Sequence, residues 1–316
     1  MSEALAIERV TKRYGQFVAV DEFSLRVPRG QVLGFLGPNG AGKTTTIRMV
    51  MSIIHPDSGS ISVLGHPRAS EVKDRIGYLP EERGLYRKMT VREILEYIGQ
   101  LKGLHGAALR ERIDEGLERV GLGDWKRKKV EALSKGMQQK LQFVATILHR
   151  PELLILDEPF SGLDPLNTHL LEQLVEELRA AGTTVLFSTH QMNQAERLCD
   201  RIALINKGRL VIEGTVPEVR SRFAGRVLVI DAEGDLSHLR VLPGVVSAQV
   251  TAGHARLELD EDVEPNAILQ SALARASILR FEVQSPSLQE IFVKLVGGAP
   301  VNRSLSERCA AEVARG

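Results

Sequence analysis

The sequence predicts an α/β fold with a mixed, mainly parallel sheet, followed by a smaller α+β unit. Two almost wholly apolar runs, Leu153–Leu156 and Thr184–Phe187, are typical of parallel strands buried on both faces. The amphipathic segment between them, Leu166–Ala180, is long enough to be the crossover helix. A further apolar run, Gln31–Leu36, leads through a glycine-rich loop into the helical pattern Lys43–Ile54. This alternation of strands and helices predicts a parallel sheet as the core of the chain.

The other elements of the first part follow from local signals. Three short strand patterns separated by turn residues predict an antiparallel β subdomain at Leu5–Val10, Phe17–Val20 and Phe23–Val27. Thr90 and Glu93 form a capping box that opens a helix extending to about Leu101. Ser134 can cap a second helix. Its apolar face holds Met137, Leu141, Val144, Ala145 and Leu148. These helices predict a helical subdomain.

The periodicity restarts after about Ala224. Before that point, Gly208 separates Ile202–Asn206 from Leu210–Glu213, which predicts a hairpin. Beyond it, strand patterns occur at Arg226–Asp231, Val245–Val250, Ala255–Leu259 and Leu279–Gln284, and helical patterns at Asn266–Ala276 and Leu288–Leu295. We therefore expect one domain over residues 1–223 and a small α+β domain over 224–297. The polar residues 298–316 are expected to be a disordered tail.

Composition excludes several classes of protein. The 316 residues include 41 basic and 40 acidic side chains, so the net charge of +1 does not indicate nucleic acid or anionic lipid as the main partner. Two cysteines make no disulfide framework and have no zinc-ligand spacing. The N-terminus lacks the basic end and apolar run of a signal peptide, and no apolar stretch approaches the roughly 20 residues of a membrane span. We expect a cytoplasmic chain that works at a membrane only through a partner.

A phosphate-binding loop follows the strand Gln31–Leu36. Its residues are Gly37, Pro38, Asn39, Gly40, Ala41, Gly42, Lys43, Thr44 and Thr45, the pattern G-x-x-x-x-G-K-T. The glycines let backbone N–H groups turn towards phosphate oxygens, and the following helix adds its positive N-terminus. Lys43 can reach the β- and γ-phosphates, and the Thr44 hydroxyl can hold Mg²⁺. The alternative is a glycine-rich turn with a chance lysine, but the strand–loop–helix context favours a nucleoside triphosphate site.

Two carboxylates, Asp157 and Glu158, follow the apolar run Leu153–Leu156. Ligands bind at the carboxyl ends of strands in open parallel sheets. Asp157 suits a contact to Mg²⁺ through water, and Glu158 suits polarisation of the water that attacks the γ-phosphate. An ordinary acidic turn is the alternative; the phosphate loop upstream favours the catalytic interpretation.

Three further segments complete a recognisable order of motifs. They are Leu-Ser-Lys-Gly-Met-Gln at 133–138, Ser-Gly-Leu-Asp at 161–164 and Ser-Thr-His at 188–190. With them, residues 5–219 closely resemble the ATP-binding subunit of an ABC transporter, which has the fold of a P-loop NTPase. The resemblance implies ATP and Mg²⁺ as cofactors, ATP hydrolysis, a membrane-spanning permease as partner and a place at the cytoplasmic face of the membrane. It also implies a head-to-tail homodimer on ATP binding.

The resemblance implies a role for each matching residue. Tyr14 would stack on adenine, although a tyrosine that packs on the sheet is a serious alternative. His190 would contact the γ-phosphate, and Asp164 would couple the two sites. The signature segment would contact the γ-phosphate of the ATP on the other subunit, and it consists of Ser134, Lys135, Gly136 and Met137.

The chain also departs from the family pattern. The signature is usually Leu-Ser-Gly-Gly-Gln, and its third and fifth positions are here Lys135 and Met137. A cation at Lys135 should favour a nearby γ-phosphate. The Q-loop glutamine is replaced by Glu81, whose carboxylate can still ligate Mg²⁺ but adds negative charge beside the triphosphate.

The sequences of three segments indicate a branch of the family. Leu-Pro-Glu-Glu-Arg-Gly-Leu-Tyr at 79–86, Leu-Ser-Lys-Gly-Met-Gln-Gln-Lys at 133–140 and the C-terminal Pro-Ser-Leu-Gln-Glu-Ile-Phe at 286–292 are similar to bacterial exporters of the sodium-efflux and drug-resistance type. A soluble ABC ATPase acting on ribosomes or DNA is the second hypothesis, and a binding-only regulator is the third. We expect no nucleic-acid partner.

Two surface segments leave alternatives open. The basic run 126–129 could touch lipid headgroups or nucleic acid, although a solvated charged loop explains it more simply. Leu85, Tyr86 and Met89 could receive a helix of the permease or could pack on the helical subdomain.

Overall fold

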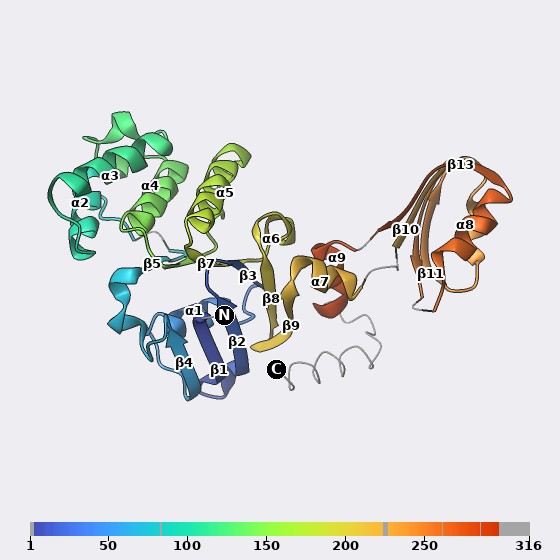
Figure 1. The fold of residues 1–316 in the computed structure, drawn as a ribbon, viewed down its shortest axis with the longest axis horizontal. Helices are drawn as coiled ribbons and strands as arrows, with labels where there is room; N and C mark the ends of the chain where they lie inside the picture. The colour runs from blue at the N-terminus through green and yellow to red at the C-terminus, as the bar shows by residue number, and fades with distance from the viewer. Residues whose placement is uncertain (1–2, 83, 224–226, 261, 285, 297–316) are drawn as a thin grey trace. The chain divides into compact units, whose positions relative to one another are not determined.

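The computed structural model describes residues 3–296, except 83, 224–226, 261 and 285. By its internal contacts the chain divides into two compact units, residues 1–213 and 214–316 (Figure 1). The domain boundary predicted from the restart of the periodicity falls about ten residues later, near Ala224. The tail expected at 298–316 lies outside the described residues. No helix in the described part of the chain has the length and apolar character needed to cross a membrane.

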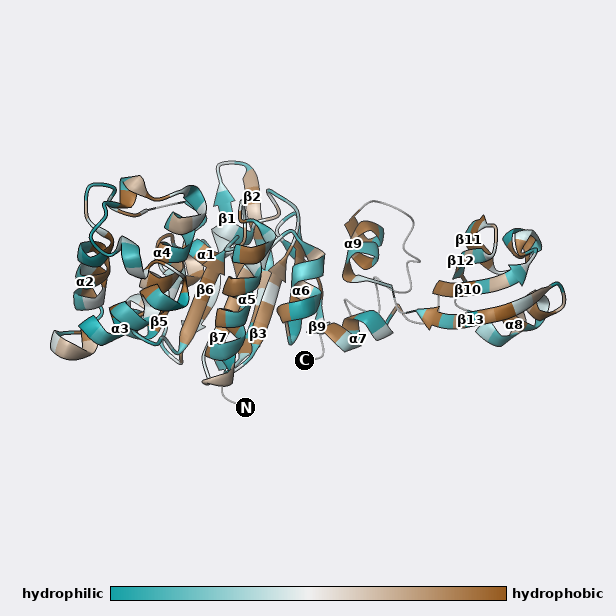
Figure 2. Cartoon of the chain, turned by 90° about the horizontal axis from the view of Figure 1, so that it is seen from above, coloured by the Kyte–Doolittle hydropathy of each residue, from teal (hydrophilic) through white to brown (hydrophobic). Residues whose placement is uncertain are grey.

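A six-stranded sheet forms the core of the first unit and confirms the mainly parallel α/β prediction. Its strand order is β5-β6-β7-β3-β8-β9. The strands are β3 (Val32–Leu36), β5 (Ile76–Leu79), β6 (Leu153–Asp157), β7 (Thr184–Thr189), β8 (Arg201–Asn206) and β9 (Arg209–Thr215). The pairs from β5 to β8 are parallel, with Leu36 opposite Thr189 and Asp157 opposite Ser188. β6 and β3 are mainly apolar along their length, as strands buried on both faces must be (Figure 2).

An antiparallel sheet, in the order β2-β1-β4, confirms the predicted β subdomain. Its strands are β1 (Glu3–Tyr14), β2 (Phe17–Pro28) and β4 (Ser58–Val63). The prediction of two separate strands before and after Asp21 was wrong. β2 continues through a bulge at which Glu22 has φ 46°, because one left-handed residue lets the ladder resume without a turn.

The helices that pack on the parallel sheet are α1 (Lys43–Val50), α4 (Lys135–Ile147), α5 (Pro165–Ala180) and α6 (Met192–Leu198). The helices α2 (Val91–Leu101) and α3 (Gly106–Arg119) pack against each other and against α4 in the helical subdomain. Short 3₁₀ helices lie at Ala69–Glu71, Lys73–Arg75, Gly123–Trp125 and Val130–Ala132. The capping box of α2 is confirmed: Glu93 N–H donates to Thr90 Oγ1 at 3.2 Å, and Thr90 N–H donates to Glu93 Oε2 at 2.7 Å. α1 ends earlier than predicted, because Ser52 takes φ 56°.

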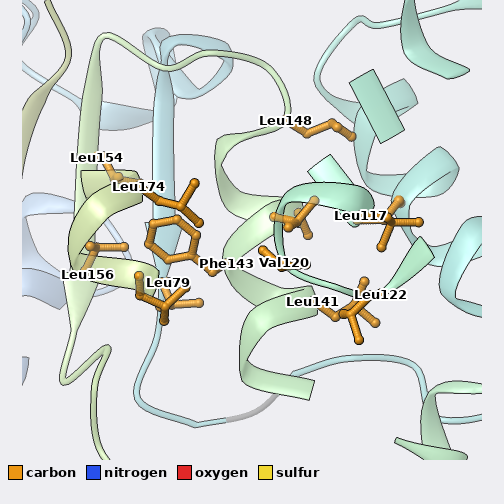
Figure 3. Close-up of a cluster of buried hydrophobic side chains, with 14 of the residues drawn as sticks. Leu79, Leu117, Val120, Leu122, Leu141, Phe143, Leu148, Leu154, Leu156 and Leu174 are labelled. Atoms are coloured by element: carbon orange, nitrogen blue, oxygen red, sulfur yellow. The ribbon is translucent and has the colours of Figure 1, made fainter. Parts of the chain in front are cut away.

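The largest core cluster joins the helical subdomain to the sheet. Figure 3 shows Phe143 of α4 among Leu79, Leu154 and Leu174, while Leu141 and other side chains meet the helices on the far side. Phe143 is fully buried, and burying a phenylalanine contributes about 1.5–3 kcal/mol. The helix that begins at the signature segment is therefore held firmly against the strands that end at the site.

The second unit is built on a four-stranded antiparallel sheet, in the order β11-β12-β10-β13. Its elements are α7 (Val216–Ser221), β10 (Val227–Gly234), a 3₁₀ helix (Ser237–Val241), β11 (Val245–Thr251), β12 (His254–Leu259), α8 (Pro265–Leu273), β13 (Ala276–Gln284) and α9 (Leu288–Val296). Leu228, Ile230 and Leu257 lie in its core, together with Ile268 of α8. The α+β character predicted for this unit is confirmed.

Candidate nucleotide-binding site

The loop between β3 and α1 adopts backbone conformations that its glycines make possible. Gly40 has φ 77°, and Gly42, the residue before α1, has φ 109°. A Cβ on Gly42 would lie 2.6 Å from the Ala19 carbonyl oxygen, so a larger residue is excluded there. The unpaired N–H groups that open α1 are available to an anion at this loop.

Lys43 is held inside the loop. Its side chain is only 6% exposed, and Nζ donates to the Gly37 carbonyl oxygen at 2.7 Å. Glu158 Oε1 lies 3.5 Å from the same nitrogen. The ammonium group is thus placed between the loop and the end of β6, where it can exchange these contacts for phosphate oxygens.

Asp157 is a buried carboxylate with one satisfied oxygen. Ser188 Oγ, on the neighbouring strand β7, donates to Asp157 Oδ1 at 2.5 Å. Oδ2 is buried and has no hydrogen-bond partner among the described residues. A buried carboxylate oxygen without a partner fits Mg²⁺ or a water bound to it. Burial, and secondly the charge of Asp157, raises the pKa of Tyr78 to about 12.

Glu158 and His190 meet at the ends of β6 and β7. His190 Nδ1 lies 3.1 Å from both carboxylate oxygens of Glu158. Glu158 has φ 50°, a conformation that costs free energy in a residue other than glycine, and its N–H donates to Ser188 Oγ at 3.0 Å. The hydroxyl of Ser188 therefore positions both acidic residues. Sequence reasoning assigned Ser188 no role, although its position opposite Asp157 in a parallel ladder could have revealed it.

A cavity of about 330 Å³ brings most of the predicted nucleotide residues together. It is lined by Tyr14, Phe17, Ala19, Pro38, Asn39, Gly40, Gly42, Lys43, Thr44, Thr45, Glu81 and Glu158. Tyr14 is 51% exposed and points to the cavity rather than packing wholly on the sheet. Phe17, which pairs with Tyr14 across the β1–β2 turn, was missed by sequence reasoning. The available signal was a second aromatic residue three positions after Tyr14, across a turn that contains Gly15.

The signature segment lies at the start of α4, away from this cavity. Ser134 Oγ accepts a hydrogen bond from Met137 N–H at 3.3 Å, as predicted for a cap. Lys135 is exposed, and Met137 packs partly against the core. Asp164 caps α5 by accepting from Asn167 N–H at 2.9 Å, and the hydrogen bonds from Asn167 lower the pKa of Asp164. Ser134, Lys135, Gly136, Met137 and Asp164 are absent from the cavity lining within the described residues.

Two glutamines of α4, which sequence reasoning missed, connect the signature helix to the site. Gln139 Nε2 donates to the Pro159 carbonyl oxygen at 3.1 Å, directly after Glu158. Gln142 Nε2 donates to the Glu82 carbonyl oxygen at 3.4 Å, directly after Glu81. Both glutamine side chains are buried, so polar residues on the buried face of this helix were the signal.

Comparison with known proteins agrees with this geometry. The family described as ABC transporter matches residues 20–161, and the C-terminal domain of the ATP-binding protein DrrA1-3-like family matches residues 214–296. The chain is 42% identical over 293 residues to the ABC transporter ATP-binding protein YhaQ of Bacillus subtilis, covering 93% of this chain and 98% of that one.

Two relatives have names that state a role. The daunorubicin/doxorubicin resistance ATP-binding protein DrrA of Streptomyces peucetius is 35% identical, over 98% of each chain. Nod factor export ATP-binding protein I of Ralstonia nicotianae is 36% identical, over 93% of this chain and 94% of that one. A solved ATP-binding subunit of an ABC transporter superposes with a TM-score of 0.65 at 33% identity, over 70% of this chain and 93% of that one.

Proposed function

The chain belongs to the ATP-binding proteins of ABC transporters, and on this premise we propose that it hydrolyses Mg²⁺-ATP at the loop 37–45 to power an exporter through a separate permease. ATPase activity and a part in transport follow from the family. Its relatives in antibiotic resistance and Nod factor export support export as the direction. The comparisons give no support to the alternative of a ribosomal or DNA-directed ATPase.

Each group at the strand ends has a task in this reaction. Lys43 and the N-terminus of α1 hold the β- and γ-phosphates. Thr44, Asp157 and Glu81 are the residues that would hold Mg²⁺, which neutralises phosphate charge when it is bound. Tyr14 would stack on the adenine ring.

Glu158 accepts the proton of the attacking water, and His190 orients its carboxylate before contacting the γ-phosphate. The observation that carries this proposal is the position of Glu158, 3.5 Å from Lys43 Nζ and 3.1 Å from His190 Nδ1. A carboxylate held between a lysine and a histidine beside a phosphate loop is suitably placed to act on a γ-phosphate.

A second copy of the chain would complete the site. Ser134, Lys135 and Gly136 are outside the cavity of their own chain, and the first two are exposed at the start of α4. A head-to-tail homodimer would place them over the γ-phosphate of the partner, and Asp164 would couple the two sites. The positive charge of Lys135 then complements the triphosphate.

Complementation between variants tests the shared site. A mixture of Ser134→Arg and Lys43→Ala chains forms one doubly defective site and one site with both elements intact. We expect partial recovery of ATPase activity over either variant alone, with a rate that depends on protein concentration. Monomeric catalysis would instead give simple additivity and no concentration dependence, which would contradict the shared site.

The segment 85–89 is the proposed docking surface for the permease, at the cytoplasmic face of the membrane. Leu85 and Met89 pack against the core of the helical subdomain, whereas Tyr86 is 57% exposed and stacks edge-on against Tyr97. Of these three side chains, Tyr86 is therefore the one that is free to contact the permease. Tyr86→Ala should reduce copurification of a multi-span protein from membranes, and Ile53→Ala, at an apolar position that is also 57% exposed, serves as the control.

A further inference from the structure

Two loops of the helical subdomain are joined into one surface. Val130 N–H donates to the Met89 carbonyl oxygen at 2.9 Å, and Glu131 N–H donates to the Arg87 carbonyl oxygen at 3.0 Å. A bridge between Thr90 and Lys129 continues the pairing. We call residues 86–90 and 126–131 together the paired-loop surface. It contains six basic side chains and one acidic side chain, Glu131, in a protein whose total charge is nearly balanced.

Five of the six cations on this surface form no ion pair with the residues that the structure describes. Lys126 forms ion pairs with Asp114 at 3.0 Å and Glu118 at 3.5 Å. The other cations are exposed, and none forms an ion pair with any residue that the structure describes; they are Arg87, Lys88, Arg127, Lys128 and Lys129. Backbone hydrogen bonds hold these unpaired like charges close together, and the charges repel one another. An anionic partner that approaches the surface therefore lowers its electrostatic free energy.

Two exposed aromatic rings lie on or next to the same surface. Tyr86 directly precedes Arg87, and its ring contacts the Tyr97 ring of α2 edge-on, with centroids 5.8 Å apart. The two rings are 57% and 42% exposed. Leu101, one helical turn beyond Tyr97, is 66% exposed. Tyrosines beside lysines and arginines are the combination found at the headgroup level of membranes.

We propose that the basic side chains of the paired-loop surface bind the anionic headgroups of the membrane directly, beside Tyr86, where the permease docks. This inference rests on the proposed function, which puts the segment 85–89 against a membrane protein. The basic side chains supply electrostatic attraction, and Tyr97 lies at the edge of the lipid contact, against the Tyr86 ring that faces the permease. The lipid contact would orient the ATP-binding subunit on the membrane independently of its contact with the permease.

Vesicle flotation of the full chain tests the proposal. The purified protein is mixed with vesicles of phosphatidylcholine containing 30% phosphatidylglycerol, or with pure phosphatidylcholine, at low salt and at 0.5 M salt. We expect binding to the anionic vesicles alone, and loss of that binding in high salt because the charges are exposed and screened. Equal binding to both vesicles, or binding to neither, would overturn the proposal.

Charge neutralisation identifies the surface. Each lysine or arginine near an anionic membrane strengthens binding about fivefold, so Arg127→Gln, Lys128→Gln and Lys129→Gln together should weaken it by roughly a hundredfold. The matched control neutralises three exposed cations elsewhere on the same unit: Arg68→Gln, Lys73→Gln and Arg110→Gln. If the control weakens vesicle binding as much as the triple variant, the general charge of the protein is responsible and the surface is wrongly assigned.

Two further measurements separate this proposal from its rivals and from its premise. The ATPase rate of the triple variant should equal that of the wild type, because its residues lie outside the nucleotide cavity. Absence of ATPase activity in the wild type would refute the proposed function, whereas intact ATPase activity without vesicle binding refutes only the lipid contact. Tighter binding of the wild type to single-stranded RNA than to the anionic vesicles would overturn lipid as the partner.

Discussion

Ser188→Ala removes a hydroxyl that serves both acidic residues of the site. The substitution deletes the 2.5 Å hydrogen bond to Asp157 Oδ1 and one of the two acceptors for Glu158 N–H, leaving only the Ser188 carbonyl oxygen at 3.2 Å. A hydrogen bond to a charged group contributes about 1.5–3 kcal/mol, which corresponds to roughly 10- to 150-fold in an equilibrium constant. Removing the partner that orients a metal ligand costs about 10- to 100-fold in metal affinity or activity. Both arguments predict a loss of about 10- to 100-fold in affinity for Mg²⁺.

The assay is a Mg²⁺ titration of ATPase activity at saturating ATP. We expect Ser188→Ala to need about 10- to 100-fold more Mg²⁺ for half-maximal activity, with a smaller change in KM for ATP, because the phosphate loop is untouched. Thr189→Val is the matched control, because it removes a hydroxyl from the same strand. That hydroxyl accepts a hydrogen bond from Gln191 N–H and makes none to Asp157. A Mg²⁺ requirement that is unchanged in Ser188→Ala, or equally raised in Thr189→Val, would refute the assignment.

Three other predictions use different measurements. Glu158→Gln should retain ATP binding and lose at least about a hundredfold in ATPase rate, whereas Glu81→Gln should stay within roughly tenfold; a collapse at Glu81 with near-normal turnover at Glu158 would reverse the assignment of the base. Tyr14→Ala and Phe17→Ala should each raise the Kd for ATP, and a residue that stacks on adenine should lose about 1–3 kcal/mol of binding free energy. Binding of free triphosphate should be unchanged. If both substitutions weaken ATP and triphosphate equally, the aromatic pair does not contact the base. Burial lowers the pKa of His149 to about 4, so the unfolded state binds a proton that the folded state does not. The free energy of unfolding is therefore unaffected by this histidine above pH 6.5. It falls as the pH drops from 6.5 towards 4, because the unfolded state takes up the proton, and the loss is about 2 kcal/mol at pH 5. Urea unfolding at pH 7 and pH 5 measures it, and His149→Gln should abolish that part of the pH dependence.

Local signals in the sequence were sufficient for the phosphate loop, the Asp157–Glu158 pair and the caps at Thr90 and Ser134. Each of these features involves residues only a few positions apart in the sequence. Their arrangement is set by hydrogen bonds at the start of a helix or by the end of the preceding strand. The parallel sheet was also predictable, because strands buried on both faces must be apolar throughout. α3 was missed, although Leu109, Ile113 and Leu117 form its buried face, because its charged residues outnumber its apolar ones.

Tertiary structure alone decided which distant residues share a site. Ser188 reaches Asp157 because two parallel strands lie in register, and Gln139 reaches the turn after Glu158 because α4 packs against the sheet. The basic loops around Lys88 and Lys128 are far apart in the chain, and backbone hydrogen bonds join them into one surface. Such contacts depend on packing between elements, and the free energy of that packing is distributed over the whole core. A sequence therefore shows which chemical groups are present, whereas the fold determines which of them meet.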